Sequence, residues 1–277
     1  MSLLLMSALI GMGGVAAGLI GALTGLGGGI VIVPLLTLGF GVDIRYAVGS
    51  SLVAVIATSS GAAAAYVKEG FTNIRVGMLL EVATVAGALL GAHLALLIPA
   101  NVIAVLFAVL VVFTAVQSLR SPSEDITVVS DALARRLRLG STYPAPEGIR
   151  RYGVRRVPLG FLLMAAAGVL SALLGIGSGV VKVLAMDRAM RLPFKVSTTT
   201  SNFMIGVTAA ASAGIYLQRG YIDPTLTFPI LLGVLAGALA GARILSRAPT
   251  RRLRLVFAGA VVLLAAEMLY KGLTGGL

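Results

Sequence analysis

The run from Met1 to Phe40 contains no charged side chain, yet a cluster of glycines interrupts it. An uncharged apolar run of this length is expected to cross a membrane as a helix. Within it, the stretch Gly21 to Pro34 reads GALTGLGGGIVIVP, and glycine destabilises the interior of a helix. The chain is therefore expected to begin with a membrane helix that breaks at these glycines and resumes beyond them.

The composition extends this expectation to the whole chain. Of its 277 residues 58% are hydrophobic and 12% are charged, and the mean hydropathy is +1.02. A water-soluble domain could not bury so much apolar surface, so we predict an all-α integral membrane protein. Long apolar segments predict about eight transmembrane helices, at residues 3–24, 46–67, 76–98, 101–119, 158–175, 196–217, 225–246 and 253–270, with shorter apolar pieces at 28–40 and 179–186.

The reactive residues are few, which limits the chemistry. The chain has no cysteine and one histidine, His93, so disulfides, thiolate-bound metals and bis-histidine haem are excluded. We expect neither a cofactor nor a metal site. An intramembrane enzyme would need a nucleophile with its base, and ATP hydrolysis would need a GxxxxGK[ST] motif. The sequence offers neither, so the protein is not expected to be an enzyme.

The sequence repeats itself at an offset of 150 residues. GALTGLGGGIVIV aligns without a gap with SALLGIGSGVVKV at 171–183, and AGALLGAHL aligns with AGALAGARI. Matched glycines, such as Gly25 and Gly175, indicate an internal duplication. We therefore expect three parts: a first membrane repeat at 1–119, a basic linker at 120–157 and a second membrane repeat at 158–277.

The net charge of +12 indicates topology rather than nucleic-acid binding. Cytoplasmic loops of membrane proteins carry an excess of Lys and Arg. If each glycine break adds one change of side, the cytoplasmic face holds 17 of the 22 Lys and Arg, and the outside holds Arg45, Arg219 and Lys271. Two parallel halves would divide the basic residues far more evenly. We predict inverted repeats in a bacterial inner (plasma) membrane, with both termini outside and the 120–157 linker cytoplasmic.

The two glycine breaks are the first candidates for a binding site. A helix that resumes in mid-membrane presents unpaired N–H groups and the positive end of its dipole, which favour an anion. Inverted repeats would bring the two breaks together near the midplane. The alternative is that the glycines only allow helices to pack closely. The candidate substrate-binding residues at the breaks are Gly27, Gly28, Gly29, Gly177, Ser178 and Gly179.

Polar residues near the breaks extend the candidate site. Lys182 is a lone cation in the short apolar segment after the second break, and an intramembrane cation suggests function by default. Its side chain could instead extend towards a membrane edge. Ser51, Ser201 and Asn202 lie in the hydroxyl-rich helix starts AVGSSL and KVSTTTSNF. Their side chains would either donate hydrogen bonds to an anion or cap helices.

With these motifs the chain resembles the sulfite exporter TauE/SafE family, also called the toluene sulfonate uptake permease family. The resemblance rests on GLGGGIVIVPLL, on GIGSGVVKV, on the hydroxyl-rich helix starts and on GALLGAHL with GALAGARI. It implies eight membrane helices in two halves and transport of sulfur-containing anions such as sulfite, sulfonates or sulfoacetate. Gly28 and Pro34 are replaced by Ser178 and Leu184 in the second half, so the halves would contact a substrate unequally.

We therefore predict a secondary transporter of small sulfur-containing anions that works by alternating access around a midplane site. An anion channel and a non-transporting membrane subunit stay open as alternatives. The expected partners are a small anion and the lipid bilayer, without nucleic acid, and GxxxG faces would allow a homodimer. The coupling ion, proton or sodium, is left open; Glu81 and Glu267 are carboxylates that could carry a proton.

Three further segments have structural interpretations. His93 and Arg243 occupy equivalent positions near helix ends, and we expect them to be structural rather than to reach a cavity. SDALARRLRL in the linker predicts a short basic amphipathic helix on the membrane surface. STYPAPEG predicts turn and linker.

Overall fold

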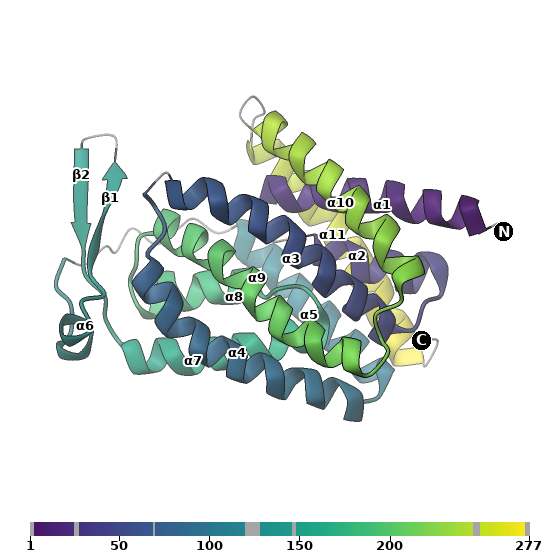
Figure 1. Ribbon diagram of the computed structural model, residues 1–277, viewed down its shortest axis with the longest axis horizontal. Coiled ribbons are helices and arrows are strands. Elements are labelled where there is room, and N and C mark those ends of the chain that lie inside the picture. The colour runs from purple at the N-terminus through teal and green to yellow at the C-terminus, as the bar shows by residue number, and fades with distance from the viewer. Residues whose placement is uncertain are drawn as a thin grey trace.

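The chain folds mostly into helices in the computed structural model, which describes residues 3–24, 28–68, 70–119, 128–145, 148–245 and 250–274 (Figure 1). Within these residues, eight helices are at least 18 residues long and begin and end within a few residues of the expected spans. Three of these helices contain stretches that are long and apolar enough to cross a membrane, Ile74–Leu97, Ala100–Gln117 and Val157–Leu174, and four further apolar stretches are shorter.

The first half contains one long helix, a short helix that follows the glycine break and continues into a π-helical turn, and three more long helices. Asn73 caps the start of the third long helix, since its side chain accepts a hydrogen bond of 3.0 Å from the Val76 amide. That helix ends at Ile98, which is extended because Pro99 follows it. The elements are α1 (Leu3–Thr24), α2 (Gly29–Pro34), the π-helix η1 (Leu35–Gly39), α3 (Ile44–Lys68), α4 (Ile74–Leu97) and α5 (Ala100–Leu119).

The second half has the same order of elements. A long helix is again followed by a short α-helix that continues into a π-helical turn, and three long helices follow. Its elements are α7 (Val157–Leu174), α8 (Gly179–Leu184), the π-helix η2 (Ala185–Ala189), α9 (Phe194–Gln218), α10 (Pro224–Leu245) and α11 (Thr250–Thr274).

The linker between the halves contains a β-hairpin, which corrects the expectation of turn and linker at STYPAPEG. A short helix, α6 (Ala132–Arg136), precedes two antiparallel strands, β1 (Ser141–Ala145) and β2 (Gly148–Tyr152). Tyr143 and Tyr152 are buried with ring centroids 5.9 Å apart. These strands are too short for their alternation to stand out in sequence, and the packing of the two tyrosines adds to the antiparallel pairing of the strands.

The two halves interlock through close helix pairs. The first helix of each half packs against the third long helix of the other, so that α1 lies on α10 and α7 lies on α4. A Cβ added at Gly18 would collide with the carbonyl oxygen of Val234, and one at the equivalent Gly168 would collide with that of Thr84. Glycine thus brings these helix backbones closer than any side chain would allow.

The loops between the helices contact one another at two opposite ends of the molecule. At one end Arg45 Nη2 donates to the Ile98 carbonyl oxygen at 3.1 Å, and the rings of Tyr46 and Tyr221 meet edge to face. Figure 1 shows the N- and C-termini at this end and the hairpin at the opposite one.

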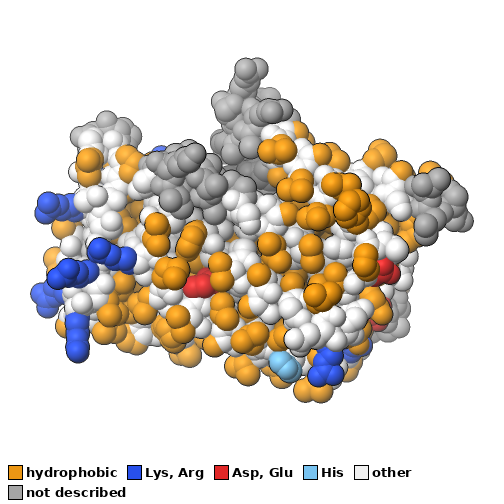
Figure 2. Space-filling view, viewed as in Figure 1, with side chains coloured by type: hydrophobic (Ala, Val, Ile, Leu, Met, Phe, Trp, Pro, Cys, Tyr) orange, Lys and Arg blue, Asp and Glu red, His pale blue; other side chains and the backbone are white. Residues whose placement is uncertain are grey.

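The hairpin end is held by contacts between the linker and two membrane loops. Asn73 Nδ2 donates to the Leu139 carbonyl oxygen at 2.9 Å, and the Arg155 amide donates to the Met190 carbonyl oxygen at 3.1 Å. On the face shown in Figure 2, Lys and Arg side chains gather mainly at this end, and hydrophobic side chains cover the helices. The linker is therefore a folded cap on the helices rather than a free connection.

Candidate functional site

The second break is a short non-helical turn between α7 and α8. Gly175 ends α7 with φ of 68°, and Gly177 follows with φ of 67°. Ser178 also has a positive φ, 45°, which costs a residue with a side chain roughly 1–2 kcal/mol. α8 then begins at Gly179. Gly28, the equivalent of Ser178 in the first half, has an ordinary helical backbone, and Gly27 lies outside the described residues.

The two breaks touch each other. A Cβ on Gly29 would collide with the carbonyl oxygen of Gly175 and would lie 3.0 Å from the Ile176 Cα atom. Gly29 starts α2 in one half, and Gly175 and Ile176 belong to the break in the other half. The absence of a side chain at Gly29 is therefore what allows the breaks to meet.

Two equivalent serines hold the second break in place. Ser51 Oγ donates to the carbonyl oxygen of Gly175 at 2.7 Å, and Ser201 Oγ donates to that of Gly179 at 3.2 Å. Both serines are buried, as is Asn202 beside Ser201 on α9. The Gly175 carbonyl lies beyond the end of α7, and the Gly179 carbonyl lies at the start of α8, so in this conformation the two serine hydroxyls position the break from both sides.

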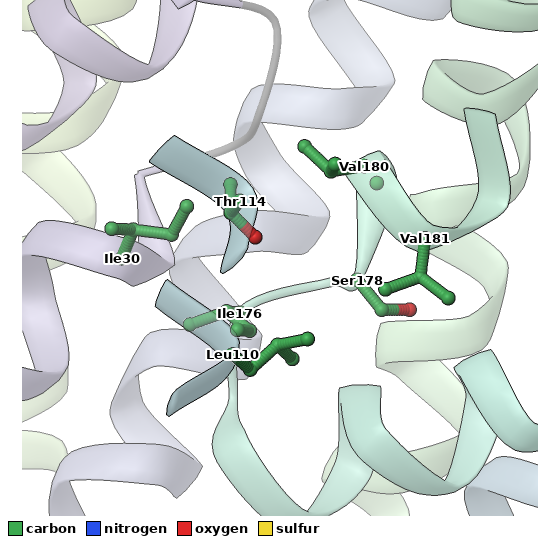
Figure 3. Close-up of a pocket in the computed structure, with 8 residues that line it drawn as sticks. Ile30, Leu110, Thr114, Ile176, Ser178, Val180 and Val181 are labelled. Atoms are coloured by element: carbon green, nitrogen blue, oxygen red, sulfur yellow. The ribbon is translucent and has the colours of Figure 1, made fainter. Parts of the chain in front are cut away.

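A narrow cavity lies between the breaks and α5 (Figure 3). Its free volume is about 10 Å³, roughly the room that one water molecule needs. Ser178 is buried here, and its hydroxyl has no hydrogen-bond partner among the described residues. The cavity therefore presents a free buried hydroxyl but is closed to a larger ligand. Its lining residues are Ile30, Leu110, Thr114, Ile176, Ser178, Gly179, Val180 and Val181.

Thr114 is a cavity residue that sequence reasoning missed. It is buried on α5, a helix without charged residues, and a single threonine in an apolar helix gives no signal by itself. It becomes a candidate only because α5 packs against α8 in the folded chain.

Lys182 does not line the cavity but enters a buried polar network. Its side chain is 0% exposed, and Nζ donates to Thr208 Oγ1 at 2.6 Å. Thr208 Oγ1 in turn donates to Glu81 Oε1 at 2.7 Å. The network joins α8, α9 and α4, so Lys182 is neither at a membrane edge nor free to meet an anion in this conformation.

The remaining candidates lie away from the breaks. His93 is exposed, with Nδ1 2.9 Å from the carbonyl oxygen of Leu89 in its own helix. Glu267 is exposed on α11, and the side chain of Arg243 lies outside the described residues. Within the described part of the chain, no group of His, Cys, Asp or Glu side chains is arranged to hold a metal ion.

The sequence matches the model of the sulfite exporter TauE/SafE family over residues 10–268. The chain belongs to this family. It is 25% identical over 268 residues to "Probable membrane transporter protein YunE" of Bacillus subtilis (strain 168), covering 94% of this chain and 96% of that one. It is 29% identical over 237 residues to "Probable membrane transporter protein YdhB" of the same organism, covering 85% and 87%.

A third relative comes from another bacterium. "Probable membrane transporter protein" of Xylella fastidiosa (strain 9a5c) is 26% identical over 266 residues, covering 95% of this chain and 94% of that one. No solved structure matches the chain. Family membership together with these names identifies a multi-pass membrane transporter rather than an enzyme.

Proposed function

We propose that this TauE/SafE protein is a secondary transporter of small sulfur-containing anions, of the sulfite, sulfonate or sulfoacetate type. Alternating access would proceed around a site at the two helix breaks. The observation that carries the proposal is the contact between Gly29 and Gly175, which sets the starts of α2 and α8 beside one cavity. The free hydroxyl of Ser178 in that cavity supplies a hydrogen-bond donor for an anion.

The contacts that the loops make at the two ends of the molecule favour inverted repeats. The 70–73 and 190–193 loops both bond to the linker, whereas the 219–223 loop meets the start of α3 at the opposite end. Two parallel halves would need 188–195 and the linker on opposite sides. With the linker and its arginines in the cytoplasm, the positive-inside rule orients both termini outwards. The membrane in question is the bacterial inner (plasma) membrane.

The closed cavity favours a carrier over a channel. A sulfonate is much larger than the space in the cavity, which is roughly the room for one water molecule, so it enters only if the halves move apart. Helix pairs α1–α10 and α4–α7 each join the halves, and rocking at these surfaces would open the breaks to one side at a time. The sulfur in the substrate class comes from the name of the family alone.

A thermal-shift series in detergent tests the site and the substrate class together. The panel is sulfite, thiosulfate, taurine, sulfoacetate, sulfate, phosphate and acetate. A ligand that binds the folded state raises its unfolding temperature. We expect selective stabilisation by a sulfite or sulfonate, and about three- to tenfold weaker binding in Ser178→Gly, which loses one hydrogen bond to the anion.

Ser178→Gly is a suitable variant because glycine fits the positive φ, and the first half already has Gly28 there. Ser60→Ala, an exposed hydroxyl on α3, is the control and should respond like the wild type. Stabilisation by acetate or phosphate instead of sulfur anions would contradict the substrate class. An unchanged affinity in Ser178→Gly would contradict the site.

A further inference from the structure

The Lys182–Thr208–Glu81 network contains two charged side chains that are not part of the proposed anion-binding site. Lys182 is 0% and Glu81 is 7% exposed, and the threonine hydroxyl bridges them with bonds of 2.6 and 2.7 Å. The second carboxylate oxygen of Glu81, Oε2, is buried and accepts no hydrogen bond from the described residues. One oxygen of this carboxylate is therefore available for a proton.

The internal repeat shows that the fold does not need these charges. At an offset of 150 residues, Lys182 corresponds to Ile32 and Glu81 corresponds to Leu231. Ile32 is fully buried, so the first half builds the same place from apolar side chains. Burying an ion pair is often no more stabilising than burying apolar residues of similar size. Packing alone thus gives no reason for the pair in the second half.

Other titratable groups lie on the helices that pack around the pair. The helices that pack around it are α3, α4, α5, α7, α8, α9 and η2. Among the described residues, α5 and α7 carry no charged side chain. Asp187, like Glu81, is a buried carboxylate. It lies on η2, five positions beyond Lys182. The remaining titratable or charged groups on these elements with described side chains are Arg45, Tyr46, Arg75, His93, Arg188, Lys195 and Tyr216.

Lys182 is also close to the cavity along the chain. Its amide donates to the Ser178 carbonyl oxygen at 3.1 Å, so the lysine lies one helical turn beyond Ser178 and directly follows Val181, and both of these residues line the cavity. While Glu81 is ionised, the pair is neutral overall. Once Glu81 takes a proton, the charge of Lys182 is uncompensated in a region of low dielectric constant and attracts an anion to the cavity.

We propose that Glu81, Thr208 and Lys182 form a proton-binding site that couples one proton to each anion transported. A proton from water adds to Glu81 Oε2, the carboxylate becomes a carboxylic acid, and the net charge of the pair rises from zero to +1. The sulfonate group of a bound anion balances that charge, so proton and anion cross together. This coupling rests on the proposed transport function.

Linkage makes the coupling measurable by binding alone. If one proton accompanies the anion, affinity for sulfoacetate falls about tenfold per pH unit once Glu81 is mostly ionised. Sulfoacetate itself does not titrate between about pH 6 and 8, since its acid groups ionise well below that range. Glu81→Gln imitates the protonated acid, so its affinity should depend less on pH than that of the wild type. Glu267→Gln, an exposed carboxylate on α11, is the matched control and should keep the wild-type slope.

A second measurement needs no ligand. A carboxylate buried without its cation takes up a proton. Infrared spectra of Lys182→Ile, which copies the residue of the first half, should show the carbonyl band of a protonated carboxylic acid at neutral pH. The band should be absent from Lys182→Ile/Glu81→Gln.

The outcomes separate this proposal from the proposed function. Sulfoacetate binding with the same affinity at every pH would overturn the coupling and leave the anion site standing. If no sulfur anion binds, the substrate class fails, and the infrared spectra decide on Glu81 alone. Absence of the acid band from Lys182→Ile would overturn the proton site. Should Lys182→Ile not fold, an acid band that titrates in the wild type and is missing in Glu81→Gln decides the same point.

Discussion

Ser51 on α3 donates a hydrogen bond of 2.7 Å to the carbonyl oxygen of Gly175, the residue at which α7 ends in the other half of the molecule. The bond joins residues 124 positions apart and satisfies a carbonyl that has left its helix. Gly29 lies against the same pair, because a Cβ there would be 2.9 Å from Ser51 Oγ. These residues therefore form a direct contact between the two halves at the second break.

Ser51→Ala is expected to lower the free energy of unfolding by about 1–3 kcal/mol, since it leaves the buried Gly175 carbonyl without this partner. Chemical or thermal unfolding in detergent measures the loss. Ser60→Ala serves as the control, because its hydroxyl is exposed and bonds only within α3, and it should change stability by less than about 0.5 kcal/mol. Equal effects of the two substitutions would show that the hydrogen bond from Ser51 to Gly175 does not stabilise the fold.

Gly29→Ala is expected to force the breaks apart, because the new Cβ would collide with the Gly175 carbonyl oxygen. A collision with backbone cannot be relieved by a rotamer change, so we expect a loss of roughly 1–3 kcal/mol. Gly214→Ala on α9 is the matched control: nothing lies within 4 Å of its added Cβ, and the helix should gain about 0.5–1 kcal/mol. Unfolding temperatures that rise in both variants would refute the contact between the breaks.

Asn73→Ser separates the helix cap that the Asn73 side chain provides from its hydrogen bonds to the linker. Serine still caps α4, but it cannot reproduce the bonds from Asn73 Nδ2 to the Leu139 carbonyl oxygen and the Tyr152 hydroxyl, of 2.9 and 2.8 Å. Burial raises the pKa of Tyr152, so its hydroxyl stays neutral when it accepts this bond.

Loss of these two bonds should leave the unfolding temperature of the helices nearly unchanged and speed tryptic cleavage within the linker about tenfold. The reason is that only the docking of the linker is weakened. Asn101→Ser, on an exposed residue of α5, should be cleaved like the wild type. A cleavage rate in Asn73→Ser equal to that of the control would mean that other contacts dock the linker.

The proposed topology predicts opposite labelling of two introduced cysteines. The chain has no native cysteine, so Thr142→Cys in the hairpin and Thr225→Cys at the start of α10 can be labelled singly. Both positions are exposed. In intact cells a membrane-impermeant maleimide should reach residue 225 only, and residue 142 should react after the cells are opened. Labelling of both residues from the same side would exclude inverted repeats.

The sequence predicted the helices well, because apolar length and glycine breaks are local signals. The expected span at 76–98 and the observed α4, Ile74–Leu97, differ only at the ends, where Asn73 and Pro99 set the limits. The cavity residue Thr114 could not be found in the same way, since only tertiary packing brings α5 to the breaks. Glu81 was a candidate from sequence, but its link to Lys182 depends on Thr208. Nothing in the sequence distinguishes this threonine from others in helices, and it becomes a bridge only because α4, α8 and α9 pack together.

Counterflow in proteoliposomes tests the central claim most directly. Vesicles that contain purified protein are loaded with unlabelled sulfoacetate, and uptake of labelled sulfoacetate against its concentration gradient is followed. A carrier with a site alternately open to each side exchanges the two pools, so we predict saturable uptake that internal sulfoacetate stimulates and that Gly29→Ala reduces. Uptake that grows linearly with concentration and ignores the internal anion would identify a channel and contradict alternating access at the breaks.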